Sequence, residues 1–548
     1  MPTFRSITAV IVFPGALFLA TSAFAADDTD AIRDRRIRAH TTFLADDLLE
    51  GRAAGTRGHA LAMAYVSAQF ERLGLEPAGL SGYLQPLALR ESRVDRDAGR
   101  LVIRHGGKEV TLENINQTVV RPAPGSTSSE VTAPAVFVGF GISAPEFGYD
   151  DFANIDIRGK IAVILAGAPA RLPATARAHY SRSKSAELAA RGAVGVVSLE
   201  TPAEEKRTPW AISVARGRFP TMRLINPDGS LLEAYPELRA SASVSRAAAS
   251  AFFTPTSRSV DAVFAASERG EPQAFPLEFE LTLAGKAAVS DTSSANVLGW
   301  LPGSDPTLSG HPLVITSHLD HLGVGQPVKG DAIYNGALDN ALGTAIMLSI
   351  AEELVSAPRA LRPVLFVSLT AEEKGLLGAY HLARTPPSRV RRYAANLNID
   401  MPVILGPVRD VIGLGAEHSN LGSKLAAAAS RQGFTVSPDP KPEEVIFVRS
   451  DQYAFIRAGV PALYLKSGVN AATGGPNLAA LEEEFRRQRY HQPSDDLSQP
   501  IHWGSAAAFA RLGADVARSI ALDPAPPQWN PGDFFGTRFG NTSDKAKP

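Results

Sequence analysis

The chain of 548 residues contains no cysteine. The absence of thiols excludes disulfide frameworks, cysteine nucleophiles and thiolate metal sites, so any bound metal would be held by His, Asp and Glu. The chain also has no excess of one charge, because it contains 55 Lys and Arg and 56 Asp and Glu. This balance argues against a nucleic-acid binder, and a hydrophobic content of 45% argues against a disordered chain. The length predicts roughly two to four domains.

Long apolar runs are also missing, apart from one at the N-terminus. Residues 7–20 are almost wholly apolar and lead into Ala23-Phe24-Ala25. This stretch is too short for a membrane span and is typical of a cleavable secretory signal, which we assign to residues 1–25. We therefore expect an exported protein, periplasmic or secreted, with no stable membrane insertion after signal cleavage.

The hydrophobic pattern divides the remaining chain into four parts. Residues 30–125 open with two predicted helices, and a Pro/Gly/Ser-rich segment at 118–130 predicts a linker. Residues 130–265 contain short apolar strands with one or two helices, which predicts a small β-rich domain. Residues 275–522 alternate strands with helices, and residues 523–548 form a Pro-rich tail that we expect to lie over the surface.

Residues 275–522 carry the clearest fold signal. Near-continuous apolar strands alternating with helices predict an α/β fold whose mostly parallel sheet is flanked by helices on both faces. The predicted strands are 313–316, 364–369, 396–399 and 462–465. The predicted helices are 341–354, 376–384, 421–432 and 506–520.

Polar side chains follow these strands where ligands bind in such sheets, at the carboxyl ends. Two histidines and several carboxylates should converge there without a nearby run of Lys or Arg. The residues are His318, Asp320, Asp339, Glu372, Glu373, Asp400 and His491, with Tyr490 beside them. So many anions would repel one another unless a cation lay between them. Oxygen and nitrogen donors favour zinc, and the number of ligands suits two ions better than one.

Five motifs resemble, in order, those of the M28 family of co-catalytic zinc aminopeptidases. They are His318-Leu319-Asp320, Gly336-Ala337-Leu338-Asp339-Asn340, Thr370-Ala371-Glu372-Glu373-Lys374-Gly375, Asn398-Ile399-Asp400 and Tyr490-His491-Gln492-Pro493. The resemblance implies a zinc-exopeptidase fold, with residues 30–125 and 275–522 in the peptidase domain and an inserted protease-associated domain at 130–265. It also implies a cis peptide bond between Asp339 and Asn340.

The same resemblance implies the roles of the ligands. Asp339 would bridge two zinc ions, His318 and Asp400 would complete one site, and Glu373 and His491 would complete the other. Glu372 would be the general base. This agrees with its position beside Glu373, because successive residues of an extended chain diverge and leave Glu372 free to accept a proton.

Other roles follow from the residues themselves. Asp320, two residues beyond His318, is expected to hold that imidazole in the required tautomer. Tyr490 is placed to polarise the scissile carbonyl or to stabilise an oxyanion. We interpret His321 as a solvated residue or an outer-shell partner, not as a ligand.

The expected function is hydrolysis of the N-terminal peptide bond of peptides that have a free N-terminus. Two alternatives stay open. One is an inactive receptor or scaffold with a peptidase fold, which would normally have lost ligands. The other is a serine enzyme of the penicillin-binding type, since Ser181-Arg182-Ser183-Lys184, Ser450-Asp451-Gln452 and Lys466-Ser467-Gly468 resemble its three short motifs.

Overall fold

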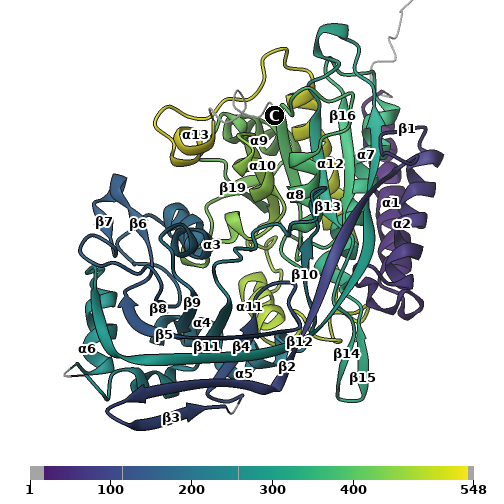
Figure 1. Ribbon diagram of the computed structural model, residues 1–548. Helices are drawn as coiled ribbons and strands as arrows, with labels where there is room; N and C mark the ends of the chain where they lie inside the picture. Colours follow the sequence, from purple (N-terminus) through teal and green to yellow (C-terminus); the bar gives the residue numbers. More distant parts are fainter. Residues whose placement is uncertain (1–17, 114, 257, 541–548) are drawn as a thin grey trace, which may run out of the picture.

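The computed structural model describes residues 18–113, 115–256 and 258–540. An α/β part, built around a mostly parallel sheet, lies beside a β-rich part (Figure 1). The predicted α/β fold with helices flanking the sheet is therefore confirmed.

The sheet of the α/β part has four parallel strands at its centre. In spatial order the strands are β19 (Thr435–Ser437), β18 (Asp410–Leu414), β20 (Ala462–Ser467), β17 (Ala395–Ile399), β13 (Leu313–His318), β16 (Val364–Leu369) and β12 (Ala274–Leu301). Strands β20, β17, β13 and β16 run parallel, whereas β18 and β12 pair antiparallel with the outer two. The carboxyl ends of the four central strands therefore meet at one edge.

Helices cover both faces of this sheet. On one face lie α1 (Phe18–Leu44), α2 (Arg57–Arg72), α7 (Leu342–Ser356), α9 (Leu421–Gln432) and α12 (Trp503–Ala521); on the other lie α8 (Leu377–Arg384) and α10 (Gln452–Arg457). Side chains of β13 alternate between the faces, with Leu313 and Ile315 in one core and Val314 in the other. Burial on both faces explains the unbroken apolar run of this strand.

The β-rich part holds a second core. Its strands are β4 (Thr118–Pro122), β5 (Ser128–Val138), β8 (Ile161–Leu165), β9 (Gly195–Leu199) and β11 (Ala240–Val244), and its helices include α3 (Ala174–Ala190), α4 (Pro202–Arg207), α5 (Trp210–Arg216) and α6 (Val260–Glu268). Smaller strands are β3 (Lys108–Leu112), β6 (Ser143–Ala144) and β7 (Tyr149–Asp150). The domain boundaries at 130 and 265 stay predictions.

Two very long strands join the two parts. β12 pairs with β5 near its start and with β16 near its end, and along most of its length it pairs with β2 (Leu84–His105). The prediction of a linker at 118–130 is wrong, because this segment contains β4, a tight turn and the start of β5. Proline and glycine are as typical of such turns as of linkers, and Gly125 has a φ of +81° in this turn.

Most predicted elements of the α/β part agree with the structure. Strand β16 and helix α9 have the predicted bounds, and each of the other elements differs at one or both ends by one to three residues. The largest shift is at α12, which begins at Trp503 because His502 accepts a hydrogen bond from the Ser505 N–H and caps the helix. The tail also differs from its prediction: α13 (Phe534–Phe539) forms there, and the Phe535 side chain is fully buried.

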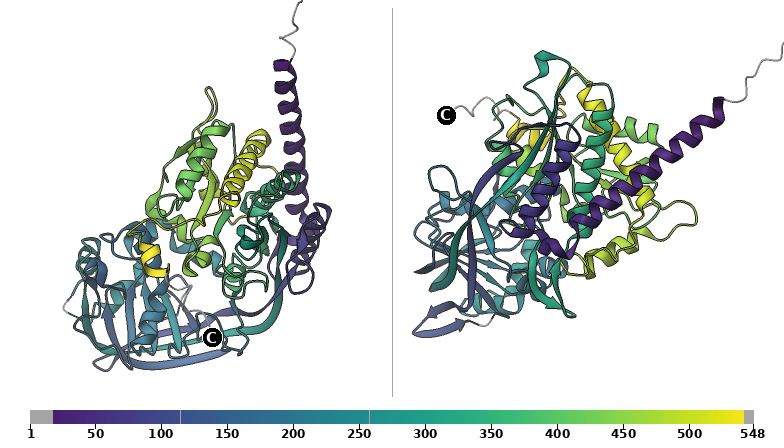
Figure 2. Two further views of the ribbon diagram at one scale, coloured as in Figure 1. Left: turned by 90° about the horizontal axis from the view of Figure 1, so that it is seen from above. Right: turned by 90° about the vertical axis from the view of Figure 1, so that its right-hand side faces the viewer.

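The predicted signal at residues 1–25 lies mostly outside the described residues. Its last part, from Phe18, belongs to α1, whose N-terminal turns project away from the body of the protein (Figure 2). Every helix within residues 18–113, 115–256 and 258–540 is too short or too polar to cross a bilayer.

Replacing the buried Leu348 of α7 by alanine should lower the free energy of unfolding by about 2 to 5 kcal/mol, because the substitution leaves a cavity in the core. Chemical denaturation of both proteins measures the difference. Leu61→Ala is the matched control, since this leucine also lies on a helix but is 43% exposed. An equal loss in both variants would contradict the core that we describe.

Candidate metal centre

Five segments bring polar side chains to the carboxyl edge of the sheet. His318 is the last residue of β13, Asp400 directly follows β17, and Glu373 follows β16. Asp339 lies just before α7, and its peptide bond to Asn340 is cis, as the resemblance implied. His491 comes from the loop after α11 (Leu478–Gln488). The predicted ligands, far apart in sequence, therefore meet in one place.

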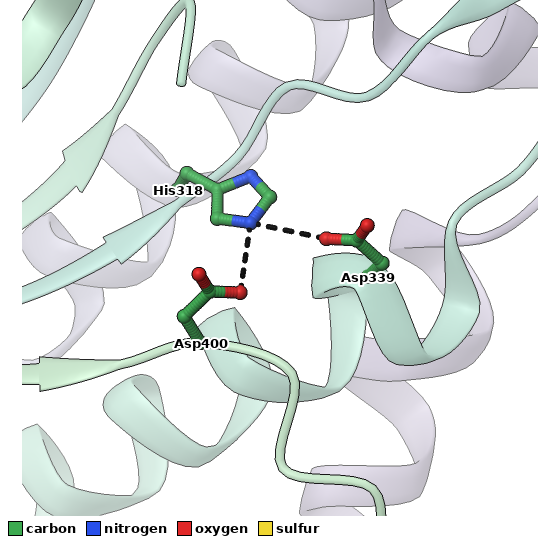
Figure 3. Close-up of side chains that lie close together, drawn as sticks. All are labelled: His318, Asp339 and Asp400. Carbon is green, nitrogen blue, oxygen red and sulfur yellow. Dashed lines mark hydrogen bonds and ion pairs between the residues drawn. The ribbon is translucent and has the colours of Figure 1, made fainter. Parts of the chain in front are cut away.

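The first group of ligands surrounds the His318 ring (Figure 3). Its Nε2 atom lies 3.2 Å from Asp339 Oδ1 and 3.1 Å from Asp400 Oδ1. All three side chains are at most 8% exposed. His318, Asp339 and Asp400 thus form one compact set of one nitrogen and two oxygen donors.

The second group shares Asp339 with the first. His491 Nε2 lies 3.3 Å from Asp339 Oδ2 and 3.1 Å from Glu373 Oε2. The two oxygens of Asp339 therefore face different histidines, His318 on one side and His491 on the other. This is the arrangement expected of a carboxylate between two cation sites.

The spacing of these atoms fits metal ions. A tetrahedral zinc site with bonds of about 2.0 to 2.1 Å has edges of about 3.3 Å, and the four N–O separations in the two groups are 3.1 to 3.3 Å. In addition, Glu373 Oε1 is buried without a hydrogen-bond partner. Buried polar atoms normally have a partner, so the residues present fit a bound cation.

The close contact of these groups shifts the pKa values of several histidines and carboxylates in the cluster. Burial opposes a charge on His318, but Asp400 and Glu372 outweigh it and raise the pKa of this imidazole well above its ordinary value. His491 likewise has a pKa raised to about 9, since Glu373 and Asp339 outweigh its burial. Burial also raises the pKa of Glu372 well above that of an ordinary carboxyl. Without ions, protons on the histidines balance the carboxylates, so metal binding must release protons.

Asp320 acts through different atoms from those predicted. Its backbone oxygen, not its carboxylate, lies 3.1 Å from His318 Nδ1. Its carboxylate accepts the N–H groups of Glu372, at 3.0 Å, and Glu373, at 3.3 Å. The Asp320 carboxylate therefore orients the two glutamates through their backbone N–H groups. Its backbone oxygen orients the imidazole of His318.

Two supporting residues were missed by the sequence analysis. The carboxylate of Asp495 accepts the N–H groups of Leu338, at 2.9 Å, and Asp339, at 3.1 Å. The buried Arg52 guanidinium donates to backbone oxygens of Leu319, Leu44, Asn335 and Gly336. Both lie in sequence contexts typical of exposed turns, so only the fold reveals their roles.

The cluster opens into a cleft of about 760 Å³. His491 lines this cleft, and the Tyr490 ring stacks on it with centroids 3.8 Å apart. Burial raises the pKa of the Tyr490 hydroxyl. The hairpin of β14 (Gly323–Val328) and β15 (Asp331–Tyr334) forms one wall, and residues 211–222 of the neighbouring part form another, including Ile212, Phe219 and Met222.

The three serine-enzyme motifs do not assemble into a site. Lys184 Nζ donates to the Leu165 oxygen, and Lys466 Nζ donates to the Met401 oxygen. Ser450 Oγ accepts a hydrogen bond from Asn398. Among the described residues, no hydrogen bond joins Ser181 to Lys184, so the structure gives no support to this alternative.

Comparisons with known proteins point to one family. Residues 296–517 match the model of Peptidase family M28. Aminopeptidase YwaD of Bacillus subtilis (strain 168) is 31% identical over 137 residues, which are 24% of this chain and 27% of that protein. The chain thus spans about a quarter of the length of the curated relative that it matches.

One solved structure shows the same fold, and a second is similar to this chain. The aminopeptidase from Aneurinibacillus sp. strain AM-1 has a TM-score of 0.51 and 20% identity, over 90% of this chain and 95% of that chain. The structure of BSAP, a zinc aminopeptidase from Bacillus subtilis, has a TM-score of 0.44 and 19% identity, over 89% and 95%.

Asp495→Ala should lower the free energy of unfolding of the metal-free protein by about 1 to 3 kcal/mol for each of the two buried N–H groups that lose their acceptor. Denaturation in the presence of a chelator measures this loss. Asp496→Ala is the neighbouring control, because the donors to that carboxylate within the described part of the chain come from Ser498 in a local turn. A larger loss in Asp496→Ala would contradict the role of Asp495.

Proposed function

We propose that this chain, whose residues 296–517 match the model of Peptidase family M28, is a di-zinc aminopeptidase that removes N-terminal residues from peptides. The observation that carries the proposal is the sharing of Asp339 between two groups of ligands, with a histidine facing each of its oxygens. His318, Asp339 and Asp400 would hold one ion, and Asp339, Glu373 and His491 the other. Bound zinc would supply a water of lowered pKa and would polarise the scissile carbonyl.

Glu372 is the general base in this proposal. Asp320 holds the Glu372 N–H and so fixes the start of the side chain beside the cluster. Burial raises the pKa of the Glu372 carboxyl, which lets a proton taken from water stay on an Oε atom until it passes to the leaving amine. The neighbouring Glu373 is turned toward His491 and cannot take this role.

Tyr490 is proposed to contact the substrate. Its ring stacks on His491 and lines the cleft, so its hydroxyl can donate to the scissile carbonyl oxygen as negative charge develops there. The raised pKa keeps this hydroxyl protonated at neutral pH, as a donor must be.

The cleft supports a peptide substrate with a free N-terminus. His491, which lines the cleft, lies 3.3 Å from Asp339 and 3.1 Å from Glu373, carboxylates that suit an ammonium group. Walls with Ile212, Phe219 and Met222 suit apolar side chains. We propose that the β-rich part, interpreted as a protease-associated domain, limits access to this site.

The residues expected of a working site are all present, which argues against the inactive scaffold. Export by the signal at residues 1–25 is part of the same proposal.

Glu372→Ala should keep both zinc ions and lower kcat by about 10² to 10⁴-fold, the usual contribution of general acid–base catalysis. Asp339→Ala should instead lose zinc, because both sites share this carboxylate. Metal analysis and initial rates on an aminoacyl chromogenic substrate measure the two effects. Full activity of Glu372→Ala would overturn the assigned base.

A panel of matched peptides tests the reaction class. The wild-type protein should cleave peptides with a free N-terminus and leave the N-acetylated versions intact, since the acetyl group removes the ammonium charge. A chelator should abolish this cleavage, and added zinc should restore it. Equal cleavage of both versions would contradict an aminopeptidase, whereas chelator-insensitive cleavage would contradict the metal mechanism.

A further inference from the structure

His321 lies against the cluster and was not predicted as a ligand. Its side chain is fully buried, so the solvated position considered for it is wrong. Its backbone N–H donates to the Arg52 oxygen at 3.2 Å. Gly336 makes room for the ring, because a Cβ atom at that position would lie 2.5 Å from His321 Cγ. The fold therefore seats this imidazole firmly beside Glu373.

The nitrogen atoms of this ring have no well-formed hydrogen bond among the described residues. His321 Nδ1 lies 2.8 Å from Glu373 Oε1 as an ion pair, and both atoms are buried. A buried polar atom left unpaired costs about 1 to 3 kcal/mol. A cation bound beside these two atoms would give both of them a partner.

The neighbours of His321 complete a donor set. Its Nδ1 atom lies 3.9 Å from Asp339 Oδ2, and these atoms together with a Glu373 oxygen form one compact group. The rings of His321 and His491 are 5.6 Å apart between centroids. Two imidazoles on one ion with Zn–N bonds of about 2.0 to 2.1 Å have centroids about 5 to 6 Å apart. The separation of the two rings falls within this range.

We propose that His321 Nδ1 is an additional ligand of the ion held by Asp339, Glu373 and His491. This inference rests on the proposed function, which supplies the metal ions. The site with His321 would have two nitrogen ligands and two carboxylate ligands, whereas the site with His318 and Asp400 would have one nitrogen and two carboxylates.

The two sites would then differ in chemistry. Four protein ligands are typical of closed, tight zinc sites, and three leave a position open for water or substrate. The first equivalent of zinc should therefore occupy the site with His321. The second should bind more weakly at the site with His318, which keeps the open position.

The test is a zinc titration of the metal-free, full-length protein against a chromophoric chelator. The wild type should bind two equivalents with distinct affinities. His321→Asn should lower the higher affinity by more than about 100-fold, beyond the 10 to 100-fold typical of outer-shell partners. Asparagine keeps an N–H near the Nδ1 position. If His321 only orients Glu373 through a hydrogen bond, the His321→Asn variant should therefore keep most of the zinc affinity.

His418→Asn is the matched control. His418 is also a buried histidine, paired with Asp533 away from the cluster, and its replacement should leave both zinc affinities unchanged. X-ray absorption of the wild type at one equivalent of zinc gives a second readout that needs no variant. It should show two imidazole ligands on that ion.

The outcomes separate this inference from the proposed function. The role of His321 alone would be overturned if the protein binds two equivalents of zinc but the first ion has one imidazole ligand. It would also be overturned if His321→Asn leaves the higher zinc affinity unchanged. A wild type that binds no zinc would overturn the di-zinc aminopeptidase as well.

Discussion

The burial of several carboxylates at one edge of the sheet is the constraint on which the rest of the site depends. Asp339, Glu373 and Asp400 lie almost out of contact with water, where unpaired negative charges are very unfavourable. When no ion is bound, the protonated imidazoles of His318 and His491 compensate the negative charge of the carboxylates, in agreement with their raised pKa values. A cation relieves the same repulsion more effectively, which makes the cluster a site poised to bind metal.

The surroundings of the cluster hold its backbone as well as its side chains. The Asp495 carboxylate accepts the N–H groups of Leu338 and Asp339, and the Asp320 carboxylate accepts those of Glu372 and Glu373. Arg52, from the segment between α1 and α2, donates to the backbone oxygen of Leu319, next to His318, and to that of Gly336, three residues before Asp339. The N-terminal helices are therefore part of the support of the site and not only a cover for the sheet.

The long strands β2 and β12 give the cleft its second wall. Because each runs through both parts of the protein, residues 211–222 are held opposite the β14–β15 hairpin. Phe219 contacts Tyr334 of that hairpin edge to face, with ring centroids 5.1 Å apart. The C-terminal tail adds another link, since Phe534 contacts His179 on α3. The walls of the cleft thus come from segments distant in sequence.

The sequence alone determined the elements of the α/β part and the polar residues that meet in the cluster. Apolar runs such as 364–369 report a strand buried on both faces, and polar residues directly after such runs must lie at the carboxyl edge of a parallel sheet. These are local properties of the chain. Tertiary structure decided what depends on contacts between distant segments: the continuity of β12 through both parts, the atoms through which Asp320 acts, the support from Asp495 and Arg52, and the position of His321. A histidine or an aspartate in a turn has the same local pattern whether it is solvated or buried, and only the packing of the whole chain distinguishes the two.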